Sequence, residues 1–235
     1  MTVDTILKEL ESYASDDTKR VLLRHGAREP FFGVKVQDLK KIVKKIKTNH
    51  ELSLQLFATG NSDAMYLAGL IADTSKISKN ELNTWAENAY WYYLSEYAVA
   101  WVAAESRYGL ELALEWIKSP RENIASAGWA TLSNYIALKP DDELDINLYS
   151  KLLDSVEKEI HHAQNRVRYT MNGFVIAVGT SIKALTKKAT EISKRIGKVT
   201  VNVGNTSCKV PLATEYIQKV IARGAIGKKK KYARC

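Results

Sequence analysis

The feature that most limits how this chain can fold is a helical pattern that recurs, with short interruptions, over more than half of its 235 residues. Between His50 and Ile182, apolar residues recur at helical spacing over segments of roughly 10–18 residues. Short polar breaks separate these segments, and no alternating strand pattern occurs among them. Many amphipathic helices joined by short links predict helical pairs stacked into an α-solenoid. We therefore expect one all-α domain over residues 1–235, with the helical array spanning residues 1–195.

The composition excludes several other classes of protein. No apolar run approaches the about 20 residues that a membrane-spanning helix needs, and the acidic, amphipathic N-terminal segment does not resemble a signal peptide. The two cysteines, Cys208 and Cys235, and four histidines without metal-ligand spacing predict neither a disulfide scaffold nor a metal site. We expect a cytoplasmic protein with no cofactor, no metal and no membrane association.

Charge is distributed unevenly along the chain. Residues 183–235 contain 14 lysines and arginines against two acidic residues, and residues 1–50 contain 11 against seven. Residues 51–182 contain 10 against 17. Two basic ends around an acidic middle indicate a polyanionic partner, for which nucleic acid is the obvious candidate.

An aromatic stretch with a single carboxylate, Ala89–Ser106, lies near the middle of the array. On a helix, Tyr92 and Glu96 are four residues apart and point to one face, whereas Trp101 points to the core. An aromatic ring beside a carboxylate is suited to a cationic or flat ligand. The alternative is structural, because aromatic residues beside a helix start are usually core and a lone glutamate is usually solvated.

The C-terminal part changes character. Residues 197–211 alternate strictly and contain Gly204–Asn205, which predicts a β-hairpin with a two-residue turn. Cys208 is then expected to pack as a small apolar side chain rather than to act as a nucleophile. Residues 212–227 are expected to form a last helix and turn. The basic tail, residues 228–235, is suited to phosphate contact, although a solvated tail is the ordinary alternative.

Several motifs resemble those of one known family. FFGVKVQDLKKIVKKI (residues 31–46) is similar to the FFGV-x-V-x-x-L-R motif of the HEAT-like repeat alkylpurine DNA glycosylases (AlkD-like, DNA alkylation repair). WYYLSE (residues 91–96), NIASAGWATL (residues 123–132) and RYTMNGFVIAVGT (residues 168–180) resemble three further segments. The resemblance implies an all-α horseshoe whose basic concave face holds DNA. Active members cleave the N-glycosidic bond of N3- or N7-alkylated purines.

The resemblance also implies where the family's site residues fall. Tyr92 takes the place of one tryptophan, Glu96 that of the aspartate and Gly128 that of the arginine, with Phe174 near the second tryptophan. Trp129 is next to Gly128 on another helix face. None of the four matched residues is identical, and a longer carboxylate arm with no arginine implies that the chemistry is lost. The hairpin resembles an insertion in a sister branch (AlkF/AlkG-like) that lacks glycosylase activity and favours branched DNA.

We therefore expect a monomeric, non-catalytic protein that binds branched or distorted DNA through backbone contacts. One alternative is an alkylpurine DNA glycosylase that uses Glu96. The other is a protein-interaction solenoid whose acidic middle binds a basic partner. The residues expected to contact DNA are Lys35, Lys40, Lys41, Lys44, Lys45, Lys198, Lys209, Lys228, Lys229, Lys230 and Lys231, together with Arg166 and Arg168.

Overall fold

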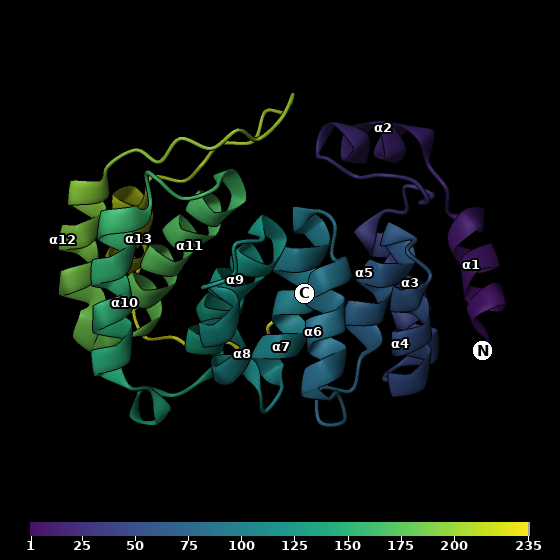
Figure 1. The fold of residues 1–235 in the computed structure, drawn as a ribbon, viewed down its shortest axis with the longest axis horizontal. Coiled ribbons are helices and arrows are strands. Elements are labelled where there is room, and N and C mark those ends of the chain that lie inside the picture. Colours follow the sequence, from purple (N-terminus) through teal and green to yellow (C-terminus); the bar gives the residue numbers. More distant parts are fainter. Residues whose placement is uncertain (235) are drawn as a thin grey trace.

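Four helical segments stack in sequence order and form the central row of the protein (Figure 1). They are α5 (Ser62–Ile71), the continuous pair η1 (Leu94–Val99) and α7 (Ala100–Glu105), α9 (Glu122–Leu138), and α11 (Asn165–Ser181). Arg166, in the first turn of α11, bonds to the first turn of α9 and to η1. The N-terminal ends of these three segments therefore lie together, and we call that side of the row its N-terminal edge.

Shorter helices flank this row in the computed structural model, which describes residues 1–234. The flanking row consists of α4 (His50–Ala58), α6 (Lys79–Asn88), α8 (Gly109–Trp116), α10 (Ile146–Glu159) and α12 (Thr186–Ile196). The array begins with α1 (Val3–Ser12), α2 (Asp16–Arg24) and α3 (Val36–Ile46) and ends with α13 (Ala213–Ala222); the 3₁₀ turns are η2 (Asp141–Glu143) and η3 (Lys183–Leu185). The expected all-α repeat array is confirmed.

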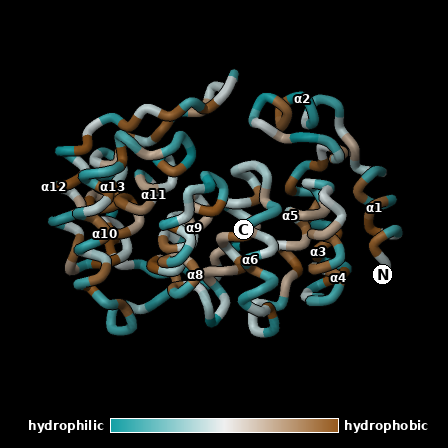
Figure 2. Tube along the Cα trace, in the orientation of Figure 1, coloured by the Kyte–Doolittle hydropathy of each residue, from teal (hydrophilic) through white to brown (hydrophobic). Residues whose placement is uncertain are grey.

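Local sequence explains where several of these helices begin. Asn61 and Asp145 each accept backbone N–H groups of the first turn that follows them, and Ser78 forms a reciprocal capping box with Glu81. Hydrophobic and hydrophilic residues are mixed along the outer helices (Figure 2), whereas α5 is buried along almost its whole length. The apolar residues pack into two buried clusters, one in the N-terminal half and one in the C-terminal half.

The β-hairpin predicted for residues 197–211 is wrong, because this segment contains no strand. It forms an extended arm that leaves α12 towards α2 and returns to α13 (Figure 1). The alternation is real, since Val199 and Val201 are buried and Thr200 and Asn202 are exposed. The backbone, however, bonds to side chains instead of to a partner strand.

Asn165 holds the arm at one point. Its side-chain Oδ1 accepts the Asn202 N–H at 2.7 Å, and its Nδ2 donates to the Asn202 carbonyl at 2.8 Å. The hydroxyl of Thr206 accepts the N–H of Cys208 in the same manner. Cys208 is exposed, so the prediction that it packs as a core residue is also wrong.

The basic tail crosses the side of the central row opposite to the N-terminal edge. Residues 227–234, which we call the C-terminal strap, run from α13 past the C-terminal ends of α11, α9, α7 and α5. Figure 1 shows this end of the chain finishing in the middle of the array. Among residues 1–234, no helix combines the length and the apolar composition that spanning a bilayer requires.

Candidate nucleic-acid interface

A π-helical turn presents the aromatic–carboxylate pair. Leu94–Val99 form the π-helix η1, a wider turn that occurs in short pieces and often at functional sites. Tyr92 precedes this turn, and Glu96 and Tyr97 lie within it. Trp101 is buried, as expected. The hypothesis that Tyr92 and Glu96 share one surface is supported by their common neighbour, Arg166.

Arg166 bonds to both oxygens of Glu96. Its Nε donates to Oε1 at 2.8 Å and its Nη2 to Oε2 at 2.5 Å. The guanidinium lies between two rings, 4.1 Å from the centroid of Tyr92 and 4.3 Å from that of Tyr169. Planar cations stacked on aromatic faces gain cation–π energy, so four side chains from η1 and α11 form one rigid cluster.

Burial governs the electrostatics of this cluster. The Glu96 side chain is 4% exposed, and this burial raises its pKa to about 7, although Arg166 acts in the opposite direction. Burial disfavours the charge on Arg166, but the hydrogen bond and attraction of Glu96 raise its pKa. Burial also raises the pKa of Tyr92 to about 12. The cluster is therefore an ion pair at alkaline pH and a lone cation once Glu96 is protonated.

The cluster lines a cavity of about 310 Å³ between α2 and the arm. On the α2 side, the Tyr92 hydroxyl lies 2.8 Å from Nδ1 of His25. On the other side, the arm contributes Asn202, Val203, Gly204 and Cys208. A Cβ on Gly204 would lie 2.7 Å from the carbonyl oxygen of Arg24, so the tip of the arm already contacts the end of α2. The cavity is roofed by two segments that are 180 residues apart in the sequence.

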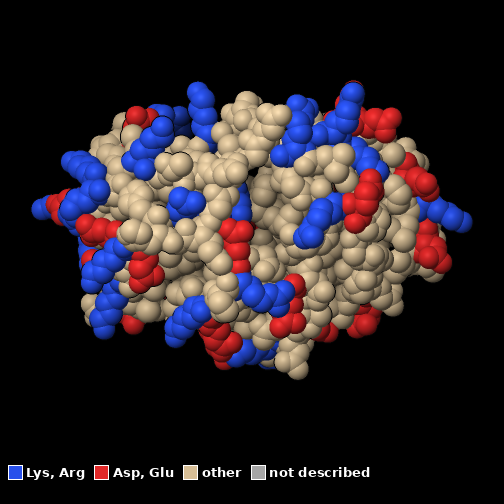
Figure 3. All heavy atoms as spheres, turned by 45° about the horizontal axis from the view of Figure 1, so that its top comes forward, with Lys and Arg blue, Asp and Glu red and all other residues tan. Residues whose placement is uncertain are grey.

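Cationic side chains gather around this part of the surface. Figure 3 shows lysine and arginine atoms on both sides of a hollow in the upper part of the molecule. The first turn of α11 lies at the same cavity, where Arg166 lines it, and the backbone N–H of Arg166 donates to the carboxylate of Glu122. The N-terminal edge thus combines a stacked guanidinium, tyrosine rings and a basic rim.

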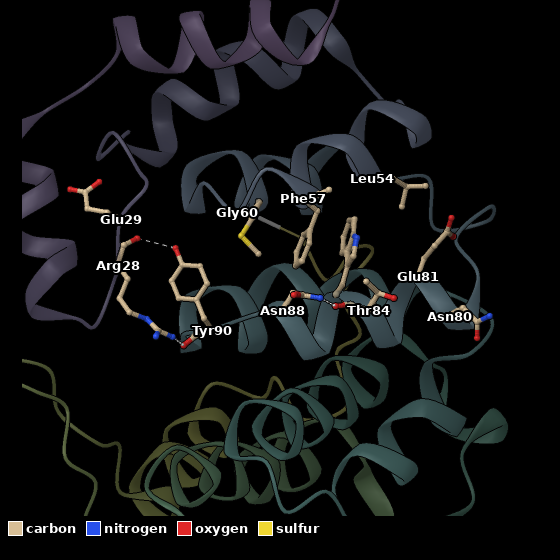
Figure 4. A pocket seen from close by; sticks show the side chains of 13 residues that line it. Arg28, Glu29, Leu54, Phe57, Gly60, Asn80, Glu81, Thr84, Asn88 and Tyr90 are labelled. Carbon is tan, nitrogen blue, oxygen red and sulfur yellow. Dashed lines mark hydrogen bonds between the residues drawn. The ribbon is translucent and has the colours of Figure 1, made fainter.

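A larger hollow of about 740 Å³ lies between α4 and α6 (Figure 4). Phe57 and Trp85 stack within it, with ring centroids 4.2 Å apart. At one end, Arg28 donates to the Tyr90 carbonyl and Tyr90 donates to the Arg28 carbonyl. Its lining is mostly apolar and contains a single cation, Arg28, so it is a poor place for a polyanion despite its size.

Of the five cleft residues expected from the sequence, Tyr92 lines the cavity, Glu96 lies buried behind Arg166, and the other three lie elsewhere. Gly128 is buried in α9, where a Cβ would lie 2.7 Å from the backbone nitrogen of Ile117. Trp129 and Phe174 pack edge to face in the C-terminal core. Gly128 thus permits close packing of α8 on α9 and does not mark a lost arginine in the cavity.

The expected phosphate contacts divide into free and occupied side chains. Lys41 pairs with Asp38 and Lys45 with Glu9. The Nζ of Lys229 donates to the carbonyls of Ile136 and Ser181, so its ammonium group already has protein acceptors. Arg168 does not line the cavity, and its Nε is buried without a partner. The exposed lysines outside these pairs are Lys35, Lys40, Lys44, Lys198, Lys209, Lys228, Lys230 and Lys231.

Sequence reasoning missed several residues that shape this edge. His25 lines the cavity without belonging to any motif, and Tyr169 lies within the motif of residues 168–180 but was not singled out, although it follows Arg166 by three residues and so shares its helix face. Asp63 was also missed. Its carboxylate accepts the N–H groups of Phe32, Gly33 and Val34, which explains why the FFGV motif holds its shape. Among residues 1–234, no group of three or more potential metal ligands was found.

Comparison with known proteins identifies the family of this chain. A model of the family described as DNA alkylation repair enzyme matches residues 6–216. The chain belongs to the DNA alkylation repair enzyme family. Its relatives include uncharacterised proteins of Listeria innocua, 34% identical over 225 residues, and of Listeria monocytogenes, 35% identical over 225 residues. In both cases the match covers 93% of this chain and 97% of the relative.

A solved structure matches this family member over its full length. It is described as "a new family of proteins related to the HEAT-like repeat DNA glycosylases with affinity for branched DNA structures". The two chains are 40% identical, each is covered completely, and the TM-score is 0.92. The suspected relationship to HEAT-like repeat DNA glycosylases is therefore confirmed.

Proposed function

We propose that this protein binds branched DNA at its N-terminal edge, between α2 and the arm, without cleaving a glycosidic bond. The observation that carries the proposal is the Arg166 guanidinium, paired with Glu96 and stacked between Tyr92 and Tyr169 at the cavity between α2 and the arm. The affinity of the matched protein for branched DNA supports the same conclusion. We further infer that the protein acts as a monomer in the cytoplasm.

The geometry of Glu96 argues against catalysis. A carboxylate that stabilises an oxocarbenium-like transition state, or positions a water, needs an oxygen free to face the sugar. Both oxygens of Glu96 accept hydrogen bonds from Arg166, and the side chain is buried. Its charge is therefore already neutralised by the protein.

Binding to a four-way junction and to a linear duplex of the same sequences tests the proposal. We expect tighter binding to the junction, and binding to both that weakens steeply with salt. Arg166→Lys keeps the positive charge but loses the planar guanidinium that stacks on the tyrosine rings, so it should weaken junction binding. Arg195→Lys is the matched control, because Arg195 forms a similar pair with Glu157 on α10, away from the cleft.

Three outcomes would contradict the proposal in different ways. Equal affinity for junction and duplex removes the preference for branched DNA. Absence of DNA binding at physiological salt favours the protein-interaction solenoid. Release of 3- or 7-methylpurine from methylated duplex, abolished in Glu96→Gln, makes the protein a glycosylase.

A further inference from the structure

The C-terminal strap donates hydrogen bonds to carbonyl groups at the C-terminal ends of the helices in the central row. The last carbonyl groups of a helix have no partner within the helix and carry partial negative charge. Gly227 donates its N–H to Thr180 of α11, and Lys230 donates its N–H to Ala137 of α9. Lys229 adds an ion pair with Asp141 at 2.7 Å. The basic tail therefore has protein carbonyls and carboxylates as partners.

Arg234 is the most connected side chain of the strap. Its Nε and Nη2 donate to Oε2 of Glu105, at 3.0 and 2.6 Å. Its Nη1 lies 2.8 Å from the carbonyl oxygen of Ala72, at the end of α5. The other oxygen of Glu105 accepts the backbone N–H of Ala233 at 2.8 Å. These contacts fix the strap to α5 and α7.

The strap joins the two halves of the molecule. It starts at α13, whose Ile217 belongs to the C-terminal core, and Ala233 is buried in the N-terminal core. The walls of the cleft also belong to different halves, because Leu22 of α2 packs against the N-terminal core, whereas Val199 and Val201 of the arm belong to the C-terminal one. A tie along one edge of a stack of packed helices fixes the angles between them, and with these angles the spacing of the helix ends at the opposite edge.

We propose that the C-terminal strap sets the opening of the DNA cleft, with Glu105 and Arg234 as positioning residues that never touch DNA. This inference rests on the proposed function, because the cleft is the one assigned there to branched DNA. It gives the tail a role different from the phosphate contact that its lysines predict.

Glu105→Gln distinguishes a positioning role of the strap from phosphate contact by its lysines, because the two roles predict changes of opposite sign in DNA affinity. The substitution removes a negative charge, so electrostatics alone should tighten DNA binding. If the strap positions the cleft, junction affinity should fall by about tenfold and the junction-to-duplex ratio should fall with it. Glu111→Gln removes the same charge from an exposed pair with Lys79 and should leave the ratio unchanged.

A second variant and a DNA-free measurement exclude a simple loss of folding. Arg234→Lys keeps the positive charge but loses the planar guanidinium group, and it should reproduce the fall in the junction-to-duplex affinity ratio. A partly unfolded protein would instead lose affinity for both DNAs equally. Spin labels on Cys208 of the arm and on Arg20→Cys of α2, with Cys235→Ser, report the cleft width. We expect one narrow distance distribution in the parent protein and a broader, longer one in Glu105→Gln.

The two proposals can fail separately. An unchanged or raised junction ratio in Glu105→Gln, with an unchanged distance distribution, overturns the role of the strap while branched-DNA binding stands. If the parent protein binds no DNA, the proposed function fails, and the label distances still decide whether the strap controls the opening.

Discussion

The two edges of the central row each carry a partly buried arginine–glutamate pair, and the two pairs differ in what surrounds them. At the N-terminal edge, Arg166 is held by the buried Glu96 and faces tyrosine rings and a cavity. At the C-terminal edge, Arg234 and Glu105 are surrounded by backbone groups that complete their hydrogen bonds. The same chemistry thus serves two purposes: a pair closed by backbone fastens segments together, and a pair left open to a cavity can receive a ligand.

Removing Arg166 from the pair that is open to the cavity should have the largest effect on the free energy of unfolding. Arg166→Ala leaves Glu96 buried and unpaired, which should lower the free energy of unfolding by about 3–5 kcal/mol at pH 8. At pH 5.5, below the raised pKa of Glu96, the carboxyl group is already neutral and the loss should be smaller. Urea unfolding at both pH values measures the difference, and an equal loss at both would contradict the raised pKa.

Removing Arg234 from the pair that is closed by backbone groups should lower the free energy of unfolding by less. In Arg234→Ala, Glu105 keeps the backbone N–H groups of Ala233 and Arg234, so only part of its hydrogen bonding is lost. We expect the free energy of unfolding to fall by about 1–3 kcal/mol. A loss as large as that of Arg166→Ala, measured in the same urea titration, would mean that backbone donors do not distinguish the two pairs.

Gly128→Ala tests a residue that belongs to neither edge. The added methyl group would press on the backbone of Ile117, so we expect a loss of about 1–3 kcal/mol in the free energy of unfolding. The junction-to-duplex affinity ratio should stay unchanged, because the glycine lies in the core. A changed ratio with normal stability would return Gly128 to the cleft.

The pH dependence of DNA binding should reflect the open pair. Lowering the pH from 8 to 6 protonates Glu96, which removes a negative charge beside Arg166, so DNA affinity should rise by about fivefold. His25 lines the same cavity, so the measurement is repeated in His25→Gln and in the double variant Glu96→Gln/His25→Gln. We expect His25→Gln to keep the rise in affinity and the double variant to lose it.

The smallest effect concerns single lysines. Lys40→Ala removes an exposed cation and should reduce the slope of log affinity against log salt by about 1, whereas Lys229→Ala should leave the slope unchanged. Binding isotherms at several salt concentrations decide between them. Equal slopes for both variants and the parent protein would show that Lys40 lies outside the DNA path.

The sequence predicted those features that depend on neighbouring residues. Helical periodicity gave the array, and Asn61 and Ser78 cap the helices that follow them. The i, i+4 spacing of Tyr92 and Glu96 indicated a shared surface, to which Arg166 brings both residues.

Features that depend on distant partners could not be predicted. Arg166 is 70 residues from Glu96, and no local pattern links them. Alternation between residues 197 and 211 correctly placed Val199 and Val201 in the interior but not Cys208, and it does not specify a partner for the backbone, which Asn165 provides. The run of lysines at residues 228–231 shows in the sequence that the tail is basic. Its partners are helix ends that only the fold brings together, so they could not be predicted.

The strap also restricts how this architecture can change during evolution. Repeat arrays ordinarily gain and lose units easily, because each unit contacts only its neighbours. Here a segment of eight residues, which spans at most about 3.3–3.6 Å per residue, reaches across four consecutive helix ends. An inserted repeat would move the end of α5 out of reach of Arg234. The length of the strap therefore fixes the number of repeats between α5 and α11.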